Sequence, residues 1–380
     1  MFSRADWQKR LDAGWKKRSV VWLMGVRRVG KTQLTKSLPN VAYFDCELPR
    51  TRAAMSDPEA FLDSVAGQTI VLDEIHRLPD PSELLKIAAD HYPNVRIVAT
   101  GSSTLAASKR FRDTLTGRKS EVWLTPMTRA DISAFGKTDI LHRMLRGGLP
   151  SFFLAEELPE TEYQEWIDAY WARDIQELFH LERREAFRRL LELVLVQSGG
   201  IFDAARLARD CGVSHTTIGN YAAVLEATFV VHLVRPFAKR GRAEIVSAPK
   251  AYAFDTGFVC HQRGWRELRR DDFGILWEHL VLNELHAHFG RDPVRYWRTR
   301  NGREVDFVLD RRGGPPVAIE CKWSASDFDS SNLRAFRSIY THGQSLVATA
   351  DTSPGRAYEK RVGDLRFTFV AIEDLINHCQ

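Results

Sequence analysis

A phosphate-binding loop near the start of the chain limits the possible folds more than any other feature. Residues 25–32 read Gly-Val-Arg-Arg-Val-Gly-Lys-Thr, which fits the pattern G-x-x-x-x-G-K-[ST]. An apolar run, 20–24, precedes this loop, and a segment of helical character, 33–38, follows it. The order predicts a buried strand, a glycine-rich turn whose backbone N–H groups surround phosphates, and a helix whose N-terminus adds positive dipole. We therefore expect an α/β protein that binds a nucleoside triphosphate.

The loop assigns a role to each of its polar residues. Lys31 is expected to reach the β- and γ-phosphates of ATP, and the Thr32 hydroxyl is expected to bind Mg²⁺. The residues expected to contact the nucleotide are Gly25, Val26, Arg27, Arg28, Val29, Gly30, Lys31, Thr32 and Gln33.

Two further strands are predicted to end at the same edge of the sheet. The apolar run 69–72 leads into Asp73 and Glu74, and parallel α/β sheets bind ligands at the carboxyl ends of their strands. We expect Asp73 to hold Mg²⁺ and Glu74 to polarise the attacking water; the alternative is two solvated acids at a strand end. The apolar run 96–99 is followed by hydroxyl side chains that are candidate γ-phosphate sensors: Thr100 and Ser102.

Length and composition favour a cytoplasmic protein of two or three domains. The chain has 380 residues, 44% of them hydrophobic and 27% charged, which is ordinary for a soluble globular protein. The net charge of +5 permits nucleic acid or an acidic partner without requiring either. Five scattered cysteines without a C-x-x-C pair favour a reducing compartment. We find no signal peptide and no apolar run long enough to span a membrane, so no membrane partner is expected.

The pattern of elements divides the chain into three expected domains. Apolar strands alternate with amphipathic helices in residues 1–140, as in a parallel sheet covered by helices. Residues 141–248 are expected to form helices and a winged helix, and residues 249–380 a second α/β domain. Arg118 follows the helix after the third strand and is a candidate arginine finger for a neighbouring subunit; the alternative is an ordinary surface arginine.

A helix-turn-helix is predicted in residues 203–227. A short helix, 203–211, is followed by the turn at Gly212 and by Ser214, which suits the N-cap of a second helix. The strand 229–233, the basic loop that follows and Ile245-Val246 are expected to form a wing. The candidate DNA contacts are His215, Thr216, Thr217, Asn220, Lys239, Arg240 and Arg242. The alternative is a module that docks a protein or covers the ATPase site.

A second group of polar residues is predicted in the last third of the chain. Asp306 lies in an apolar strand, and a glycine-proline turn leads to the strand that contains Glu320 and Lys322 on one face. Asp306 and Glu320 could hold a divalent cation, and Lys322 could orient a water that attacks a phosphodiester. Glu278, on an upstream helix, is a candidate additional acid. The alternative is a β-hairpin with an ordinary ion pair.

Together these motifs resemble a widespread bacterial and archaeal family of AAA+-type ATPases with a C-terminal domain of unknown function. The segments that carry the resemblance are 25–32, 72–78, 100–103, 115–118, 146–150, 173–175, 249–257, 277–278 and the set Asp306, Glu320 and Lys322. The resemblance implies an ATPase core, a winged helix and a C-terminal fold similar to PD-(D/E)xK nucleases. It also implies assembly into a ring such as a hexamer. In one departure from the family, Thr100 or Ser102 replaces the usual sensor asparagine.

Three functions are compatible with these observations. The first is an ATP-driven protein that binds or remodels DNA, including branched or recombining DNA. The second is a Mg²⁺-dependent DNA nuclease gated by ATP. The third is a nucleotide switch that binds a protein partner in stress or toxin–antitoxin signalling.

Overall fold

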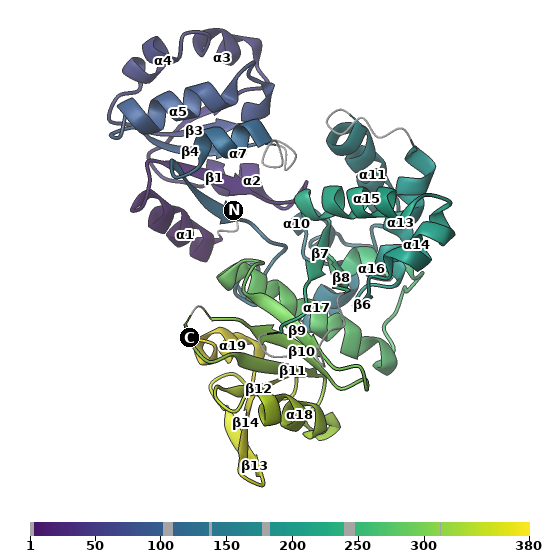
Figure 1. The fold of residues 1–380 in the computed structure, drawn as a ribbon. Coiled ribbons are helices and arrows are strands. Elements are labelled where there is room, and N and C mark those ends of the chain that lie inside the picture. The colour runs from purple at the N-terminus through teal and green to yellow at the C-terminus, as the bar shows by residue number, and fades with distance from the viewer. Residues whose placement is uncertain (1–3, 102–108, 137–138, 177–182, 239–247, 312) are drawn as a thin grey trace.

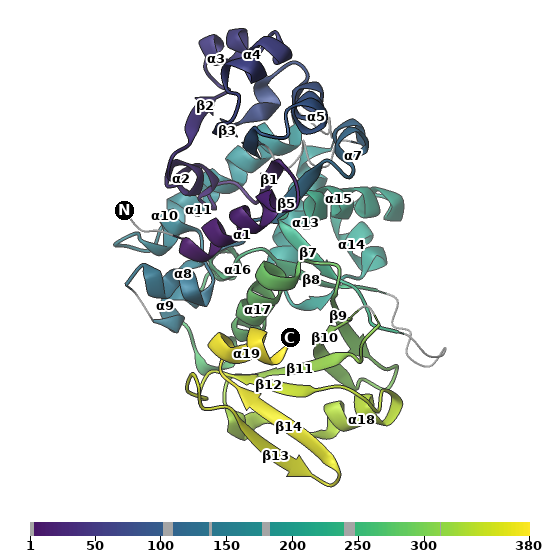
Figure 2. The same cartoon turned by 90° about the vertical axis from the view of Figure 1, so that its left-hand side faces the viewer.

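The computed structural model describes residues 4–101, 109–136, 139–176, 183–238, 248–311 and 313–380. Figure 1 shows three regions in chain order: an N-terminal α/β core, a teal helical region beside it, and a green and yellow β-rich region at the opposite end. Figure 2 shows the long helix α17 (Arg270–Phe289) lying between the N-terminal core and the C-terminal sheet. The expected fold class, a parallel α/β core followed by helical and β-rich regions, is confirmed.

The N-terminal core is a five-stranded parallel sheet in the order β2-β3-β4-β1-β5. Its strands are β1 (Val20–Met24), β2 (Ala42–Asp45), β3 (Thr69–Asp73), β4 (Arg96–Thr100) and β5 (Lys119–Trp123). Its helices are α1 (Ala5–Trp15), α2 (Lys31–Lys36), α3 (Pro49–Ala54), α4 (Pro58–Ser64), η1 (Ile75–Arg77), α5 (Pro81–His91) and α7 (Lys109–Leu115).

Both faces of the three central strands, β1, β3 and β4, are buried, as their continuous apolar sequences predict. In β1, Val20 and Trp22 pack into one hydrophobic cluster with β3, β4 and α5. The alternate residues Val21 and Leu23 face a second cluster that continues into the helical and C-terminal regions. The helical region is therefore packed directly on the N-terminal core.

The middle region is mainly helical and contains one small antiparallel sheet in the order β6-β8-β7. Its helices are α8 (Arg129–Ala134), α9 (Ile140–Arg146), α10 (Pro150–Phe153), α11 (Glu160–Ala169), the π-helix η2 (Tyr170–Ile175), α13 (Arg184–Val196), α14 (Ala204–Cys211), α15 (His215–Ala227) and α16 (Thr256–Gln262). Its strands are β6 (Gly200–Ile201), β7 (Val231–Val234) and β8 (Lys250–Ala253).

The predicted helix-turn-helix is present as α14 and α15. Asp203 and Ser214 cap the two helices, and Gly212 ends α14 in the left-handed conformation. The predicted wing consists of the strand 229–233, the basic loop after it and Ile245-Val246. In the structure the strand β7 pairs with β8. Ile245-Val246 lies outside the described residues. Because β8 pairs with β6 and β7, the expected domain boundary at residue 248 would separate strands of one sheet, and we place it nearer α17.

The C-terminal region is a six-stranded mixed sheet in the order β13-β14-β12-β11-β10-β9. Its strands are β9 (Val294–Arg298), β10 (Glu304–Leu309), β11 (Val317–Lys322), β12 (Ser345–Thr349), β13 (Tyr358–Val362) and β14 (Leu365–Val370), and its other elements are η4 (Ala325–Asp327), α18 (Ser331–Ile339) and α19 (Ile372–His378). The predicted antiparallel hairpin is β10–β11, with Phe307 opposite Ile319. Among the described residues, no helix has the length and hydropathy needed to cross a membrane.

Candidate active site

The phosphate-binding loop follows β1 and leads into α2, as predicted. Gly30 has φ +102°, a backbone conformation that residues with a side chain rarely adopt. At Gly25, a Cβ atom would collide with the carbonyl oxygen of Leu124, the residue after β5. The two glycines of the motif are therefore needed for a tight turn close to the neighbouring chain.

Lys31 lies inside this loop. Its ammonium donates hydrogen bonds to the carbonyl oxygens of Gly25 at 2.9 Å and Val26 at 3.1 Å. Burial lowers the pKa of Lys31, and the nearby carboxylates of Glu74 and Asp174 oppose this effect. A buried ammonium among acidic groups at a loop of backbone amides suits the binding of a polyphosphate.

Asp73 ends β3 and is the centre of a hydrogen-bond network. Its Oδ2 accepts hydrogen bonds from Thr32 Oγ1 at 3.1 Å and from the Tyr43 hydroxyl, and its Oδ1 accepts one from Thr100 Oγ1. Thr100 in turn accepts a hydrogen bond from the backbone N–H of Glu74 at 3.1 Å. The adjacent Thr32 hydroxyl and Asp73 carboxylate are hard oxygen donors, which fits the ligand preference of Mg²⁺.

Tyr43 was not predicted as a site residue. It lies on β2, whose carboxyl end meets the same edge because β2 runs parallel to β3. Thr100 was predicted as a γ-phosphate sensor, and its hydrogen bond to Asp73 also gives it a positioning role. Ser102 lies outside the described residues.

Glu74 is held as an ionised carboxylate. Its Oε2 is 3.1 Å from His76 Nδ1. Burial favours the neutral acid, but the hydrogen bond and charge of His76 and the charges of Lys31 and Arg27 outweigh it and lower the pKa of Glu74. The backbone of Glu74 is left-handed, with φ +54°, and such strain is concentrated at functional sites.

The helical region completes the nucleotide pocket. The pocket has a volume of about 720 Å³ and is lined by loop residues together with Pro150, Ser151 and Asp174 of α10 and η2. Arg27 Nη1 lies 3.9 Å from Asp174 Oδ2, and the Arg27 carbonyl accepts a hydrogen bond from Trp166 of α11 at 3.1 Å. Pro150 and Asp174 belong to two segments that carry the family resemblance, but their place in this pocket was not predicted.

Arg118 lies outside this pocket. It precedes β5, so it sits at the amino end of the parallel strands, whereas the phosphate-binding loop follows the carboxyl end of β1. Its Nε is 2.7 Å from Asp90 Oδ1, and its Nη1 donates a hydrogen bond to the Thr114 carbonyl at 3.2 Å. Within one chain, Arg118 is not positioned to contact the nucleotide.

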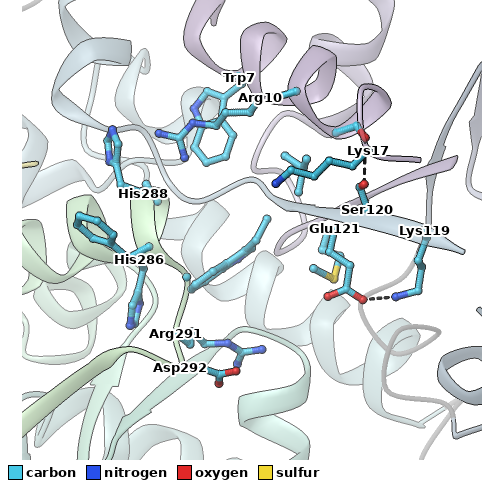
Figure 3. Close-up of a pocket in the computed structure, with 18 of the residues that line it drawn as sticks. Trp7, Arg10, Lys17, Lys119, Ser120, Glu121, His286, His288, Arg291 and Asp292 are labelled. Atoms are coloured by element: carbon cyan, nitrogen blue, oxygen red, sulfur yellow. Dashed lines mark hydrogen bonds and ion pairs between the residues drawn. The ribbon is translucent and has the colours of Figure 1, made fainter. Parts of the chain in front are cut away.

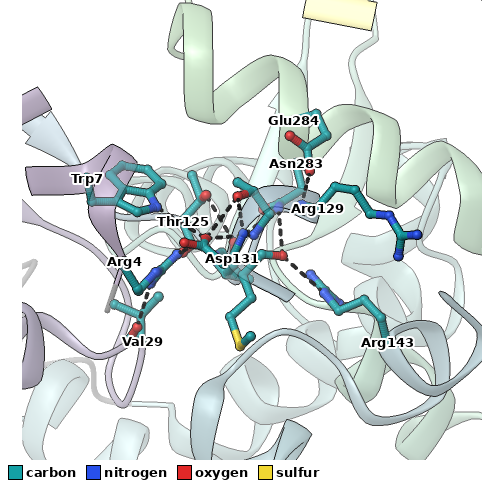
Figure 4. A network of polar contacts seen from close by, with 12 residues as sticks. Arg4, Trp7, Val29, Thr125, Arg129, Asp131, Arg143, Asn283 and Glu284 are labelled. Atoms are coloured by element: carbon teal, nitrogen blue, oxygen red, sulfur yellow. Dashed lines mark hydrogen bonds and ion pairs between the residues drawn. The ribbon is translucent and has the colours of Figure 1, made fainter. Parts of the chain in front are cut away.

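A buried polar network connects the loop to the C-terminal region (Figure 4). Arg4 Nη1 donates a hydrogen bond to the loop carbonyl of Val29 at 3.1 Å, and Arg4 Nη2 is 2.6 Å from Asp131 Oδ2 on α8. The first backbone N–H of α8, at Arg129, donates a hydrogen bond to Glu284 Oε1 of α17 at 2.6 Å. Burial alone would raise the pKa of Asp131, but the charge of Arg4 and the hydrogen bonds from Arg4 and Thr128 outweigh burial and lower this pKa.

The helix-turn-helix presents most of its predicted contact residues to solvent. His215, Thr216 and Asn220 of α15 are exposed, and Thr217 is half-buried. The Thr217 backbone N–H donates a hydrogen bond to Ser214 Oγ at 3.0 Å, which caps the helix. The predicted wing residues Lys239, Arg240 and Arg242 lie outside the described residues.

The C-terminal acidic residues come together as predicted. Lys322 Nζ is 2.9 Å from Glu320 Oε1, and Asp306 Oδ2 accepts a hydrogen bond from the Cys321 backbone N–H at 2.7 Å. Burial and Glu278 raise the pKa of Asp306 to about 6. Burial and Asp306 raise the pKa of Glu320 to about 8.

Two residues of β8 that were not predicted approach this cluster. Glu278 Oε2 accepts a hydrogen bond from the Tyr252 hydroxyl at 2.9 Å and is 3.5 Å from Lys250 Nζ. Lys250 also lies 2.8 Å from Glu304 Oε1. Within the described ranges, no group of three or more His, Cys, Asp or Glu side chains is arranged to hold a metal ion.

Comparison with known proteins relates all three regions to described families. An AAA domain matches residues 17–133, and two domains of unknown function, DUF8612 and DUF4143, match residues 137–269 and 273–364. Uncharacterized protein Rv2008c of Mycobacterium tuberculosis is 30% identical over 349 residues, which cover 88% of this chain and 77% of that protein. Uncharacterized protein Mb2031c of Mycobacterium bovis matches to the same extent.

Solved structures are more distant. A Walker-type ATPase of Pyrococcus abyssi is 15% identical with a TM-score of 0.42, over 69% of this chain and 96% of that one. The RuvB Holliday junction branch migration motor of Thermotoga maritima is 19% identical with a TM-score of 0.28, over 61% of this chain and 90% of that one. The chain matches the mycobacterial relatives over most of its length and contains an AAA domain. It therefore belongs to a family of AAA-type P-loop ATPases with a C-terminal domain of unknown function.

Proposed function

We propose that this protein is a Mg²⁺-dependent ATPase that acts on DNA. The observation that carries the proposal is the arrangement of Thr32, Asp73 and the ionised Glu74 around one pocket that also contains Lys31. All five cysteines are free, which fits a cytoplasmic protein.

Each of these residues has a distinct task in ATP hydrolysis. Lys31 would neutralise the β- and γ-phosphates, and Thr32 and Asp73 would hold Mg²⁺, which stabilises negative charge on the phosphates. Glu74 would accept a hydrogen bond from the attacking water and orient it toward the γ-phosphorus. The carboxylate must be ionised for this task, and the contact with His76 favours that state.

Contact with DNA is proposed for the exposed start of α15. The polar side chains of His215, Thr216 and Asn220 project from a capped helix N-terminus that follows a tight turn. This is the part of a helix-turn-helix that enters the major groove. Lys239, Arg240 and Arg242, which lie outside the described residues, are proposed from the sequence as phosphate contacts.

The test is steady-state ATP hydrolysis without DNA and with linear duplex, single-stranded or four-way-junction DNA. Lys31→Ala provides the blank. We expect turnover to rise with at least one form of DNA and the stimulation to weaken with salt, because phosphate contacts release counterions. Equal turnover with every DNA, together with intact basal activity that depends on Lys31, would instead support a nucleotide switch that binds a protein partner.

A DNA nuclease activity is the second candidate. It is favoured by the convergence of Asp306, Glu320 and Lys322 on adjacent strands. Glu278 already contacts Lys250 and Tyr252. The candidate ligands of a divalent cation are therefore the carboxylates of Asp306 and Glu320. If the domain cleaves DNA, Asp306→Asn should abolish cleavage with Mg²⁺ or Mn²⁺ and leave ATP hydrolysis unchanged. Absence of cleavage by the wild-type protein on all four DNA forms would make the domain a binding module.

A further inference from the structure

A groove separate from the nucleotide pocket lies between the ATPase core and the C-terminal region (Figure 3). It is formed by α1, by β5 at the edge of the parallel sheet, and by the end of α17 with the following segment to Pro293. Its volume is about 1170 Å³, larger than the nucleotide pocket. We call it the β5 groove.

Positive charge predominates in the β5 groove. Lysine and arginine side chains come from all of its walls: Arg10, Lys17, Arg18, Lys119 and Arg291. Carboxylates are contributed only by Glu121 and Asp292 among its lining residues, and Glu121 is paired with Lys119. Burial lowers the pKa of His286 to about 3, so this neighbour adds no charge near neutral pH. The groove thus suits a negatively charged ligand.

The groove also has an aromatic wall. Trp123 is half-buried, and the guanidinium of Arg291 lies 5.2 Å from the centre of its ring. The centre of the Phe229 ring lies 4.5 Å from the same guanidinium and 5.3 Å from the centre of the Trp123 ring. Phe289, also half-buried, lines the groove nearby. A stacked arginine beside partly exposed rings offers flat surfaces on which a base can stack, with a cation close enough for its phosphate.

A second hollow extends the path beyond Arg291. Its volume is about 470 Å³, and it shares His286, Arg291 and Asp292 with the β5 groove. It reaches the end of α15 at Glu226 and the strand β7. An extended ligand could therefore run from α1 along β5 and continue toward the helix-turn-helix.

We propose that the β5 groove binds single-stranded DNA. A duplex hides its bases and would contact only the cations, whereas a single strand uses both the cations and the aromatic wall. An acidic peptide would use the cations but has no base to stack on Trp123. The inference rests on the proposed action on DNA and adds to it a strand-binding site distinct from the exposed N-terminal start of α15.

The experiment measures binding to the whole 380-residue chain by fluorescence anisotropy. The probes are a labelled oligomer of about 20 thymidines, a duplex of the same length and labelled poly-glutamate. Lys17→Glu reverses an exposed charge in the groove, and Lys16→Glu makes the same change at an exposed neighbour that does not line it. Thr216→Glu tests α15. Trp123→Leu tests the aromatic wall, with circular dichroism to verify folding.

We expect Lys17→Glu to weaken thymidine-oligomer binding at least about fivefold and to reduce its salt dependence, while Lys16→Glu leaves both unchanged. Trp123→Leu should weaken the same complex without changing its salt dependence. The proposal is overturned if the oligomer does not bind, if Lys16→Glu and Lys17→Glu weaken it equally, or if poly-glutamate binds as tightly. If only Thr216→Glu weakens DNA binding, the groove assignment fails and the proposed action on DNA stands. If no DNA binds or stimulates ATP turnover, both fail.

Discussion

Replacing Glu284 with glutamine should stabilise the protein above neutral pH. Glu284 is buried on α17, and its Oε1 accepts the hydrogen bond from the Arg129 N–H. Burial raises its pKa from 4.5 to about 7, against the opposing effect of that hydrogen bond. Glutamine keeps an oxygen acceptor in the same place and removes the charge.

The size of the effect follows from the two pKa values. A difference between 4.5 and about 7 corresponds to about 3 kcal/mol of unfolding free energy. The pKa of Glu284 is higher in the folded than in the unfolded state, so its protonation contributes to the unfolding free energy at low pH. This contribution is complete below the unfolded-state pKa and is lost as the pH rises through about 7. Glu284→Gln should therefore match the wild type at low pH and exceed it by up to about 3 kcal/mol at about pH 8.

Differential scanning calorimetry at a series of pH values provides the assay. If a chain of this length unfolds as one unit, 3 kcal/mol corresponds to a rise in Tm of about 4 °C. Asn283→Asp, on the neighbouring residue, is a useful contrast because it adds charge where the Asn283 amide donates a hydrogen bond to the Pro126 carbonyl at 3.1 Å. A Tm difference between Glu284→Gln and the wild type that does not change with pH would refute the reasoning.

Three further predictions concern the ATPase core. Tyr43→Phe, which removes a hydrogen bond to Asp73, should raise the Mg²⁺ concentration needed for half-maximal ATP turnover by about 10- to 100-fold, and an unchanged Mg²⁺ titration would exclude a positioning role. Arg4→Met, which leaves the Asp131 carboxylate buried without its cation, should lower the unfolding free energy by about 3–5 kcal/mol in urea denaturation, unlike the milder Arg4→Lys. If Arg118 acts on the neighbouring subunit's nucleotide, Arg118→Ala should reduce turnover by about 10³-fold or more without weakening ATP binding, whereas an unchanged rate would make it an ordinary surface arginine.

The sequence was sufficient to predict the parts of the site that depend on local spacing. The loop at 25–32 and the strand that ends in Asp73 each form within a few residues, and their meeting follows from the rule that parallel strands end at one edge. Strand alternation likewise placed Glu320 and Lys322 on one face of β11, where their side chains are 2.9 Å apart. Local pattern and sheet geometry together determine these contacts.

Contacts between regions could not be predicted in this way, because they depend on how separately folded elements pack. Arg4 is one arginine among many in the sequence, yet it becomes the buried partner of Asp131, 127 positions away. Lys250 lies on β8, and its sequence neighbourhood gave no sign that it would pair with Glu278 of α17. A single chain carries no signal for such pairs unless a motif fixes the distance between them.

The helix α17 shows how these unpredicted contacts join the regions of the protein. Near its middle, Glu278 belongs to the C-terminal acidic cluster, and further along Glu284 binds the start of α8, which is linked through Asp131 and Arg4 to the phosphate-binding loop. Its last turn and the residue Arg291 form one wall of the β5 groove. One helix of 20 residues therefore contacts the acidic cluster, the network that leads to the phosphate-binding loop, and the β5 groove. The residues that connect the ATP site to the rest of the protein are thus those of long-range packing rather than those of the conspicuous motifs.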